Sequence, residues 1–177
     1  LSAASQTVHS ERSAHSLHGY FLRPGDPAMP IVYEVDCIRD GKSFTTRRVV
    51  AVQKGRAIFS MSASFHGNEN GFEHQTTMPE IPGPENFSSE IEMARRVADK
   101  IPAAIRNQIL CDKPIEIRPV NPNNPFAPKK MEPHRYVWFK TISSMPDDMS
   151  VHQYMLAYAS DFGLVGTALY PHGKTFW

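Results

Sequence analysis

Asp161 is the residue of this 177-residue chain whose setting best suits acid–base chemistry. It follows Tyr158 by three residues and Tyr154 by seven, so on a helix its carboxylate lies on or beside an apolar stripe. A carboxylate that loses its water there becomes a candidate general base. On spacing alone, a structural Asp that accepts hydrogen bonds from the turn at Gly163 is favoured, because structural networks also hold buried carboxylates. Both roles stay open at this point.

Histidines are the next candidates for chemistry. His15 and His18 are three residues apart on an expected strand, so they face opposite sides and cannot share one metal ion. His152 and Gln153, near the start of an expected helix, and His172 suit hydrogen bonds at helix ends and turns. These positions predict no metal site.

Nucleophilic side chains lack the local context that would activate them. Ser16 and Ser43 lie outside any G-x-S-x-G sequence, which argues against a serine hydrolase. Cys37 and Cys111 form neither a disulfide framework nor a metal-ligand spacing, and we expect both to be buried and inert in a reducing compartment. The sequence contains no G-x-G-x-x-G and no Walker A motif, so the simplest nucleotide-binding sites are excluded.

The charge balance argues against nucleic acid and membranes as partners. Lys and Arg number 19 against 18 Asp and Glu, and the two signs are interspersed, which argues against binding to nucleic acid or an anionic membrane. The longest apolar runs fall far short of the roughly 20 residues needed to cross a bilayer. Arg47–Arg48 and Lys129–Lys130 could contact ligand phosphates, but such pairs are more often solvated.

The elements that must position these residues begin with strands. From residue 15 to 66 the hydrophobic pattern has period two and is broken by turn residues, which predicts an antiparallel meander. Its expected strands are 15–22, 31–38, 43–53 and 56–66. The last strand has an apolar face on one side and a face of serines on the other, so another apolar element must cover the apolar face. We expect that cover to be the end of a helix over residues 1–7.

The second half of the chain mixes helices with short strands. We expect helices over 88–102 and 103–109, strands over 115–120 and 134–142, and a helix from Asp147 or Asp148 to Phe162. Gly163 and Gly166 are expected to interrupt this last helix. Proline-rich and glycine-rich stretches connect the elements.

Several phrases resemble the type II acyl-CoA thioesterases, the TesB-like bacterial enzymes and their peroxisomal relatives. They occur in the family's order and spacing along nearly the whole chain. The phrases are HSLHGYFLRPGD (15–26), FEHQ (72–75), IEIRPV (115–120), VHQYMLAYASD (151–161) and TALYPHG (167–173).

The resemblance implies an α+β fold, the tandem double hotdog, in which each of two units wraps an antiparallel sheet around a long helix. Residues 1–66 would be most of the first hotdog unit, and 67–114 a linker with a helix. Residues 115–177 would be the opening part of the second unit, including its central helix. The chain would then be truncated at both ends.

The resemblance also implies an activity, hydrolysis of acyl-CoA to free fatty acid and CoA without a metal, a cofactor or a covalent serine intermediate. The Asp of the family's Tyr-Ala-Ser-Asp phrase is Asp161 here, and it would assist the attack of water. The family's Ser or Thr and Gln lie beyond the Pro-His-Gly phrase and match no position of this chain. We therefore expect little or no hydrolysis by these 177 residues alone.

Two alternatives remain beside the hydrolase. One is a non-catalytic module that binds acyl-CoA, because one fold hosts several functions. The other is a hotdog hydratase, which is disfavoured because the sequence contains no Asp-x-Asn-Pro-x-His phrase. The resemblance further implies a homo-oligomer. The bacterial-type phrases favour the cytoplasm, with the peroxisomal matrix as the alternative.

Overall fold

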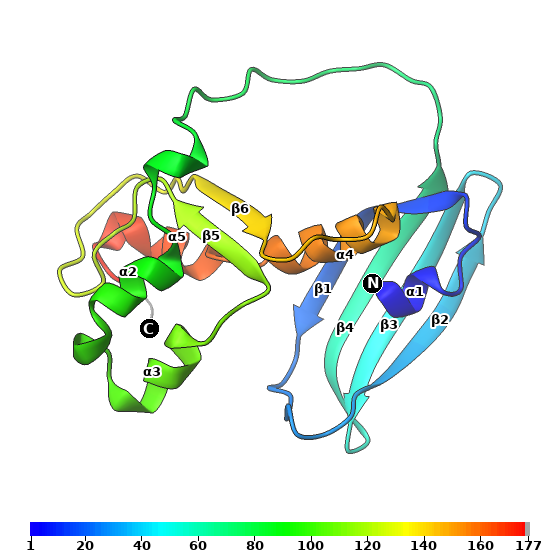
Figure 1. The fold of residues 1–177 in the computed structure, drawn as a ribbon. Helices are drawn as coiled ribbons and strands as arrows, with labels where there is room; N and C mark the ends of the chain where they lie inside the picture. The colour runs from blue at the N-terminus through cyan, green and yellow to red at the C-terminus, as the bar shows by residue number, and fades with distance from the viewer. Residues whose placement is uncertain (176–177) are drawn as a thin grey trace. The chain divides into compact units, whose positions relative to one another are not determined.

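The computed structural model describes residues 1–175. The chain forms two compact units (Figure 1). Unit 1 comprises Leu1–Gln75 with Asp148–Ala157, and unit 2 comprises Thr76–Asp147 with the chain from Tyr158 onward. No helix within residues 1–175 is long and apolar enough to cross a membrane.

Unit 1 is built on a four-stranded antiparallel sheet. Its strands are β1 (Arg12–Phe21), β2 (Val32–Asp40), β3 (Phe44–Gln53) and β4 (Arg56–Gly67). Their order is β1-β4-β3-β2, so the four expected strands are confirmed but the meander is wrong at β1. Tight turns join β2 to β3 and β3 to β4, and the second turn has positive φ at Lys54 and Gly55. The connection over 22–31, which contains Pro24, Pro27 and Pro30, leads from β1 at one edge of the sheet to β2 at the other edge.

The core of unit 1 lies where the sequence predicts it. Met61, Ala63 and Phe65 of β4 are buried together with Val49 of β3 and Ala4 of α1 (Ser2–Ser5). The helix expected over residues 1–7 is therefore shorter but covers the apolar face as expected.

A β-bulge changes the direction of one histidine in β1. The register of β1 against β4 shifts beside His15, and its Nε2 atom lies 2.8 Å from Ser64 Oγ on the serine face. The imidazole centroid lies 4.8 Å from that of His66. His18 pairs with Ser62 on the same face, so the expectation that His15 and His18 face opposite sides is wrong. The described residues contain no group of three or more side chains that could hold a metal ion.

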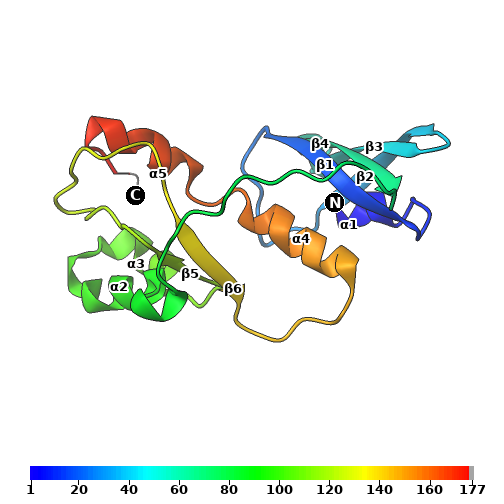
Figure 2. The same ribbon diagram turned by 90° about the horizontal axis from the view of Figure 1, so that it is seen from above.

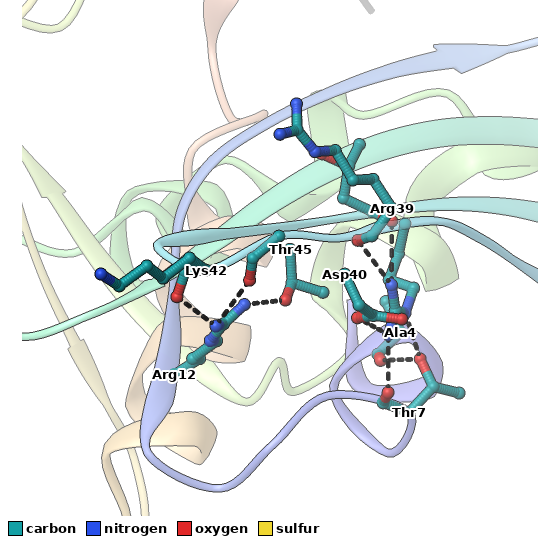
Figure 3. A network of polar contacts seen from close by, with 10 residues as sticks. Ala4, Thr7, Arg12, Arg39, Asp40, Lys42 and Thr45 are labelled. Carbon is teal, nitrogen blue, oxygen red and sulfur yellow. Dashed lines mark hydrogen bonds and ion pairs between the residues drawn. The ribbon is translucent and has the colours of Figure 1, made fainter.

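Arg47 is buried, with a side chain that is 2% exposed, against the expectation of a solvated pair. Its Nε donates to Thr7 Oγ1 at 2.8 Å and its Nη2 donates to Thr7 O at 2.9 Å and Asp40 Oδ1 at 2.7 Å. Figure 3 labels the partners Thr7 and Asp40. Arg48 follows the expectation, because it pairs with Asp36 on the surface with both side chains 54% exposed. The alternation of β3 explains the difference, since successive side chains point to opposite faces.

A second arginine fastens the β2–β3 hairpin. Arg12 Nη2 donates to the backbone oxygens of Gly41 at 2.8 Å and Lys42 at 2.7 Å, and its Nη1 donates to Thr45 Oγ1 (Figure 3). Arg12 and Arg47 therefore fix β1, the residues after α1 and the hairpin to one another with charge-assisted hydrogen bonds.

Both cysteines are exposed, which contradicts the expectation that they are buried. Cys37 lies on β2, whose only described neighbour strand is β3, and Cys111 follows α3. At these outer positions the packing within residues 1–175 leaves the thiols in contact with solvent.

Unit 2 contains a two-stranded antiparallel sheet and short helices. The strands are β5 (Ile115–Pro119) and β6 (Val137–Thr141), and the helices are α2 (Glu90–Arg96), α3 (Ala103–Leu110) and α5 (Leu164–Leu169). Helix α4 (Met149–Ala159) begins in unit 1 and ends in unit 2. Single 3₁₀ turns occur at Pro84–Asn86, Ala98–Lys100 and Tyr170–His172.

The helix starts follow the capping signals of the sequence. Ser89 caps α2 in a reciprocal capping box with Glu92, and hydrogen bonds from Ser89 hold the pKa of the Glu92 carboxyl below its ordinary value. Asp148 Oδ1 accepts from Ser150 N at 2.8 Å at the start of α4. The helix expected to reach residue 102 ends as α2 at Arg96, where the chain tightens into a 3₁₀ turn.

Candidate functional site

Asp161 lies in the turn of residues 160–163 between α4 and α5, which Figure 2 shows from above. Helix α4 ends at Ala159, earlier than the apolar stripe predicts, and Gly163 ends the turn with φ of 82°. An L-residue rarely adopts this left-handed conformation, so glycine is needed here. Gly166 lies inside α5, so only Gly163 interrupts the helices as expected.

The local environment of Asp161 matches neither role considered from the sequence. Its side chain is exposed rather than desolvated. Its carboxylate has no hydrogen-bond or ion-pair partner within residues 1–175, so the turn does not hold it as a structural Asp. The turn is closed instead by backbone bonds, from Phe162 N to Ala159 O at 3.1 Å and from Thr167 N to Gly163 O at 3.0 Å. The catalytic role of Asp161 remains a prediction.

Asp161 lines a cavity of unit 2 with a volume of about 660 Å³. The cavity brings two carboxylates and two cations together with apolar side chains from β5, β6 and the end of α4. Its charged lining residues are Glu90, Lys113, Arg135 and Asp161, and its apolar ones include Ile117, Val137, Phe139, Tyr158 and Phe162. A mixed lining of this kind suits a ligand with an apolar part and a polar part.

A short ion pair in the cavity joins Arg135 to Glu90. Arg135 Nη2 lies 2.6 Å from Glu90 Oε1, with side chains 21% and 41% exposed. The Nε atom of Arg135 is buried and has no hydrogen-bond partner among residues 1–175. A Cβ atom at Gly163 would overlap Arg135 Nη1, so the guanidinium lies directly against the backbone of the turn.

The sequence interpretation missed Arg135, Glu90 and Lys113. Glu90 was visible only as part of a helix start, and Arg135 precedes an expected strand without any motif that marks it. The glycine at 163 was the one available signal, because a residue without a Cβ can accept a close neighbour that any other residue would exclude.

Gln153 serves the fold of unit 1. Its Nε2 donates to Ala14 O at 3.0 Å, beside the bulge of β1, rather than to a helix terminus or turn as expected. Neither His152 nor His172 is among the residues that line the cavity of Asp161.

Comparison with known proteins identifies two matched regions. Residues 1–66 match the acyl-CoA thioesterase N-terminal domain, and residues 105–177 match the acyl-CoA thioesterase family model. The chain belongs to the acyl-CoA thioesterase family. The resemblance to its type II, TesB-like members is confirmed by these models together with the relatives and the solved TesB2 structure described next.

Two curated relatives match nearly the whole chain. It is 43% identical to acyl-CoA thioesterase 2 of Haemophilus influenzae, over 99% of the chain and 62% of the relative. It is 38% identical to acyl-coenzyme A thioesterase 8 of Homo sapiens, over 97% of the chain and 56% of the relative. The chain therefore spans little more than half the length of these curated relatives.

One solved structure agrees with the family, and a second agrees with the fold alone. The acyl-CoA thioesterase II TesB2 from Mycobacterium marinum matches with a TM-score of 0.71 and 37% identity, over 96% of this chain and 59% of that one. A hot dog fold protein from Alicyclobacillus acidocaldarius matches with a TM-score of 0.65 and 17% identity, over 95% of this chain and 57% of that one. The α+β hotdog class expected from the sequence is confirmed, and the coverage is consistent with a tandem double hotdog.

Proposed function

We propose that the protein hydrolyses fatty acyl-CoA to free fatty acid and CoA, with Asp161 as the general base. The observation that carries the proposal is the position of Asp161 in a mixed apolar and charged cavity of an acyl-CoA thioesterase chain. The carboxylate has no partner within residues 1–175, so it is available to a water molecule.

The reaction balances without a metal or a covalent intermediate. Asp161 takes a proton from water while the water oxygen forms a bond to the thioester carbonyl carbon. Backbone N–H groups stabilise the resulting oxyanion. The C–S bond then breaks, and the proton passes to the departing thiolate, which gives the acid and free CoA. The Ser or Thr and Gln implied by the family resemblance would orient the water.

The test is release of free CoA thiol from medium- and long-chain acyl-CoAs by the complete gene product. We expect Asp161→Asn to lower kcat by about 10²- to 10⁴-fold, the usual contribution of a general base. Asp147→Asn is the matched control, because Asp147 is exposed and does not line the cavity. Equal rates for the Asp161→Asn variant and the unsubstituted protein would exclude the assigned role.

A non-catalytic acyl-CoA binding module is the second candidate. The exposure of Asp161 favours it, because a general base is usually more shielded from water at the moment of reaction. Equilibrium binding of an acyl-CoA by the complete gene product, with no release of thiol over the same period, would favour binding over hydrolysis.

We also propose that the protein is a homo-oligomer. Tyr20 and Phe21 at the end of β1 are 63% and 76% exposed, and Val32 and Tyr33 on β2 are 60% and 54% exposed. Apolar surface of this kind favours association. Light scattering coupled to size exclusion tests the proposal, and a monomer at micromolar concentration would contradict it.

The cytoplasm is the proposed location, with the peroxisomal matrix as the alternative. A bacterial relative supports the first, and a relative named peroxisomal acyl-coenzyme A thioester hydrolase 1, from Saccharomyces cerevisiae, supports the second. Fractionation of source cells with an antibody to the protein distinguishes them.

A further inference from the structure

The guanidinium of Arg135 packs against the turn that carries Asp161. Gly163, two residues after Asp161, has φ of 82° and lies so close to Arg135 that a Cβ would overlap its Nη1. The position of this backbone is therefore coupled to the position of one side chain. Any displacement of the guanidinium changes the space available to the turn.

Arg135 is in turn held by Glu90. The 2.6 Å distance between Nη2 and Oε1 is that of a short charge-assisted hydrogen bond. Glu90 is the first residue of α2, directly after Ser89, which is 1% exposed and fixed in the capping box. The guanidinium is thus anchored to a helix start whose own geometry is well determined.

Hydrogen bonding alone does not account for the placement of Arg135. Its Nε atom is buried without a partner among residues 1–175, and a buried unpaired donor costs free energy. An arginine that only stabilised unit 2 would gain more from a position where all its N–H groups were satisfied or solvated. Its contact with the turn at Gly163 supplies a reason for the position.

We infer that Arg135, held by Glu90, is a positioning residue that fixes the 160–163 turn and, through it, the carboxylate of Asp161. The inference rests on the proposed function, because it assigns Asp161 a geometry that matters for reaction. A general base must be held within a fraction of an ångström of its productive position, and a misplacement of about 1 Å costs about 10²-fold in rate.

The main experiment compares Arg135→Ala, Arg135→Lys and Glu90→Gln in the complete gene product. The matched control is Arg95→Ala, because Arg95 also pairs with a carboxylate, Asp112 at 2.9 Å, but its side chain is 56% exposed and neither residue lines the cavity. For each variant kcat and KM are measured with one long-chain acyl-CoA, and amide hydrogen exchange is measured over residues 160–167.

We expect Arg135→Ala to lower kcat by about 10- to 100-fold while KM changes by less than about threefold. Amide exchange in the turn should rise by about tenfold, because its backbone loses its fixed neighbour. For Arg135→Lys and Glu90→Gln, both kcat and the rate of amide exchange in the turn should lie between the values of Arg135→Ala and those of the unsubstituted protein. Arg95→Ala should change neither kcat nor exchange at 160–167.

A double-mutant cycle tests the contact at Gly163 directly. In the unsubstituted background, Gly163→Ala introduces both an overlap with Arg135 and an unfavourable φ. In the Arg135→Ala background only the unfavourable φ remains. We therefore expect Gly163→Ala to reduce kcat and accelerate turn exchange by a smaller factor in that background.

The outcomes separate this inference from the proposed function. If Arg135→Ala lowers only thermal stability and leaves kcat and turn exchange unchanged, the positioning role is overturned. If the gene product has no hydrolase activity, the proposed function fails, while turn exchange and the double-mutant cycle still decide whether Arg135 fixes the turn. If Asp161→Asn is fully active, the link from the turn to Asp161 is overturned whatever Arg135→Ala does.

Discussion

Units 1 and 2 bury their side chains in different ways. Unit 1 packs a continuous apolar cluster between α1 and the sheet, and even Arg47 is withdrawn from solvent there. In unit 2 no residue of α2, α3 or α5 is buried, and charged residues such as Arg135 and Asp161 line an open cavity. The better packed unit serves as a scaffold, whereas the candidate catalytic residues lie in the unit whose α-helices bury no side chain, as is common for binding sites.

The largest test of this comparison substitutes one phenylalanine in each unit. In unit 1, Phe65→Ala should lower the free energy of unfolding by about 3–5 kcal/mol, because the Phe65 side chain is 1% exposed and its removal leaves a cavity. In unit 2, Phe139→Ala should lower the free energy of unfolding by about 1 kcal/mol or less, because the Phe139 side chain is 49% exposed. Urea denaturation measures both. Equal losses would show that the two units are packed alike.

A smaller effect should separate two neighbouring arginines of β3. Arg47→Met should destabilise unit 1 by about 2–3 kcal/mol, because Thr7 and Asp40 lose the charged hydrogen bonds of a side chain that is itself buried. Arg48→Met should cost less than about 1 kcal/mol, since its pair with Asp36 is exposed. Thermal or urea unfolding of both variants measures the two losses of stability. If Arg48→Met costs as much as Arg47→Met, the buried network does not stabilise unit 1.

The smallest expected effect is a pH dependence in unit 2. The pKa of Glu92 is lowered by hydrogen bonds from Ser89, so the folded state favours the carboxylate. Its contribution to stability is present above the ordinary value of 4.5 and is lost as the pH falls through the lower folded pKa. Amide exchange of α2 between pH 6 and pH 3 should show this loss in the unsubstituted protein and a smaller one in Glu92→Gln. Identical pH profiles for the unsubstituted protein and Glu92→Gln would exclude the capping box as the source of the pH dependence.

Much of unit 1 could be predicted because its signals are local. The period-two pattern identifies the four strands and the buried face with Met61 and Phe65, since side chains alternate along any strand. Helix starts were predicted at residue 88 and at Asp147 or Asp148, and the structure places the caps at Ser89 and Asp148, because capping depends on neighbours within one turn. The division into 1–66, 67–114 and 115–177 remains a prediction.

The errors involve contacts between residues far apart in sequence. The pairing of β1 with β4 depends on how the 22–31 connection crosses the sheet, which no local pattern records. The bulge at His15 and the burial of Arg47 follow from that pairing and from the position of Thr7. The local sequence does not distinguish a buried arginine from a solvated one, because the hydrogen-bond acceptors of the buried arginine come from distant segments of the chain.

Local patterns in the sequence identify the strands and their apolar face, the helix starts, the family resemblance and Asp161 as a candidate residue. The exposure of Asp161, the cavity that it shares with Arg135 and the contact of the guanidinium with Gly163 are visible only in the folded chain. The two sets of features differ in the range of the interactions that produce them. Periodicity and capping act over a few residues, whereas the contacts of Arg135 join it to Glu90, 45 positions earlier, and to a turn formed after the next helix.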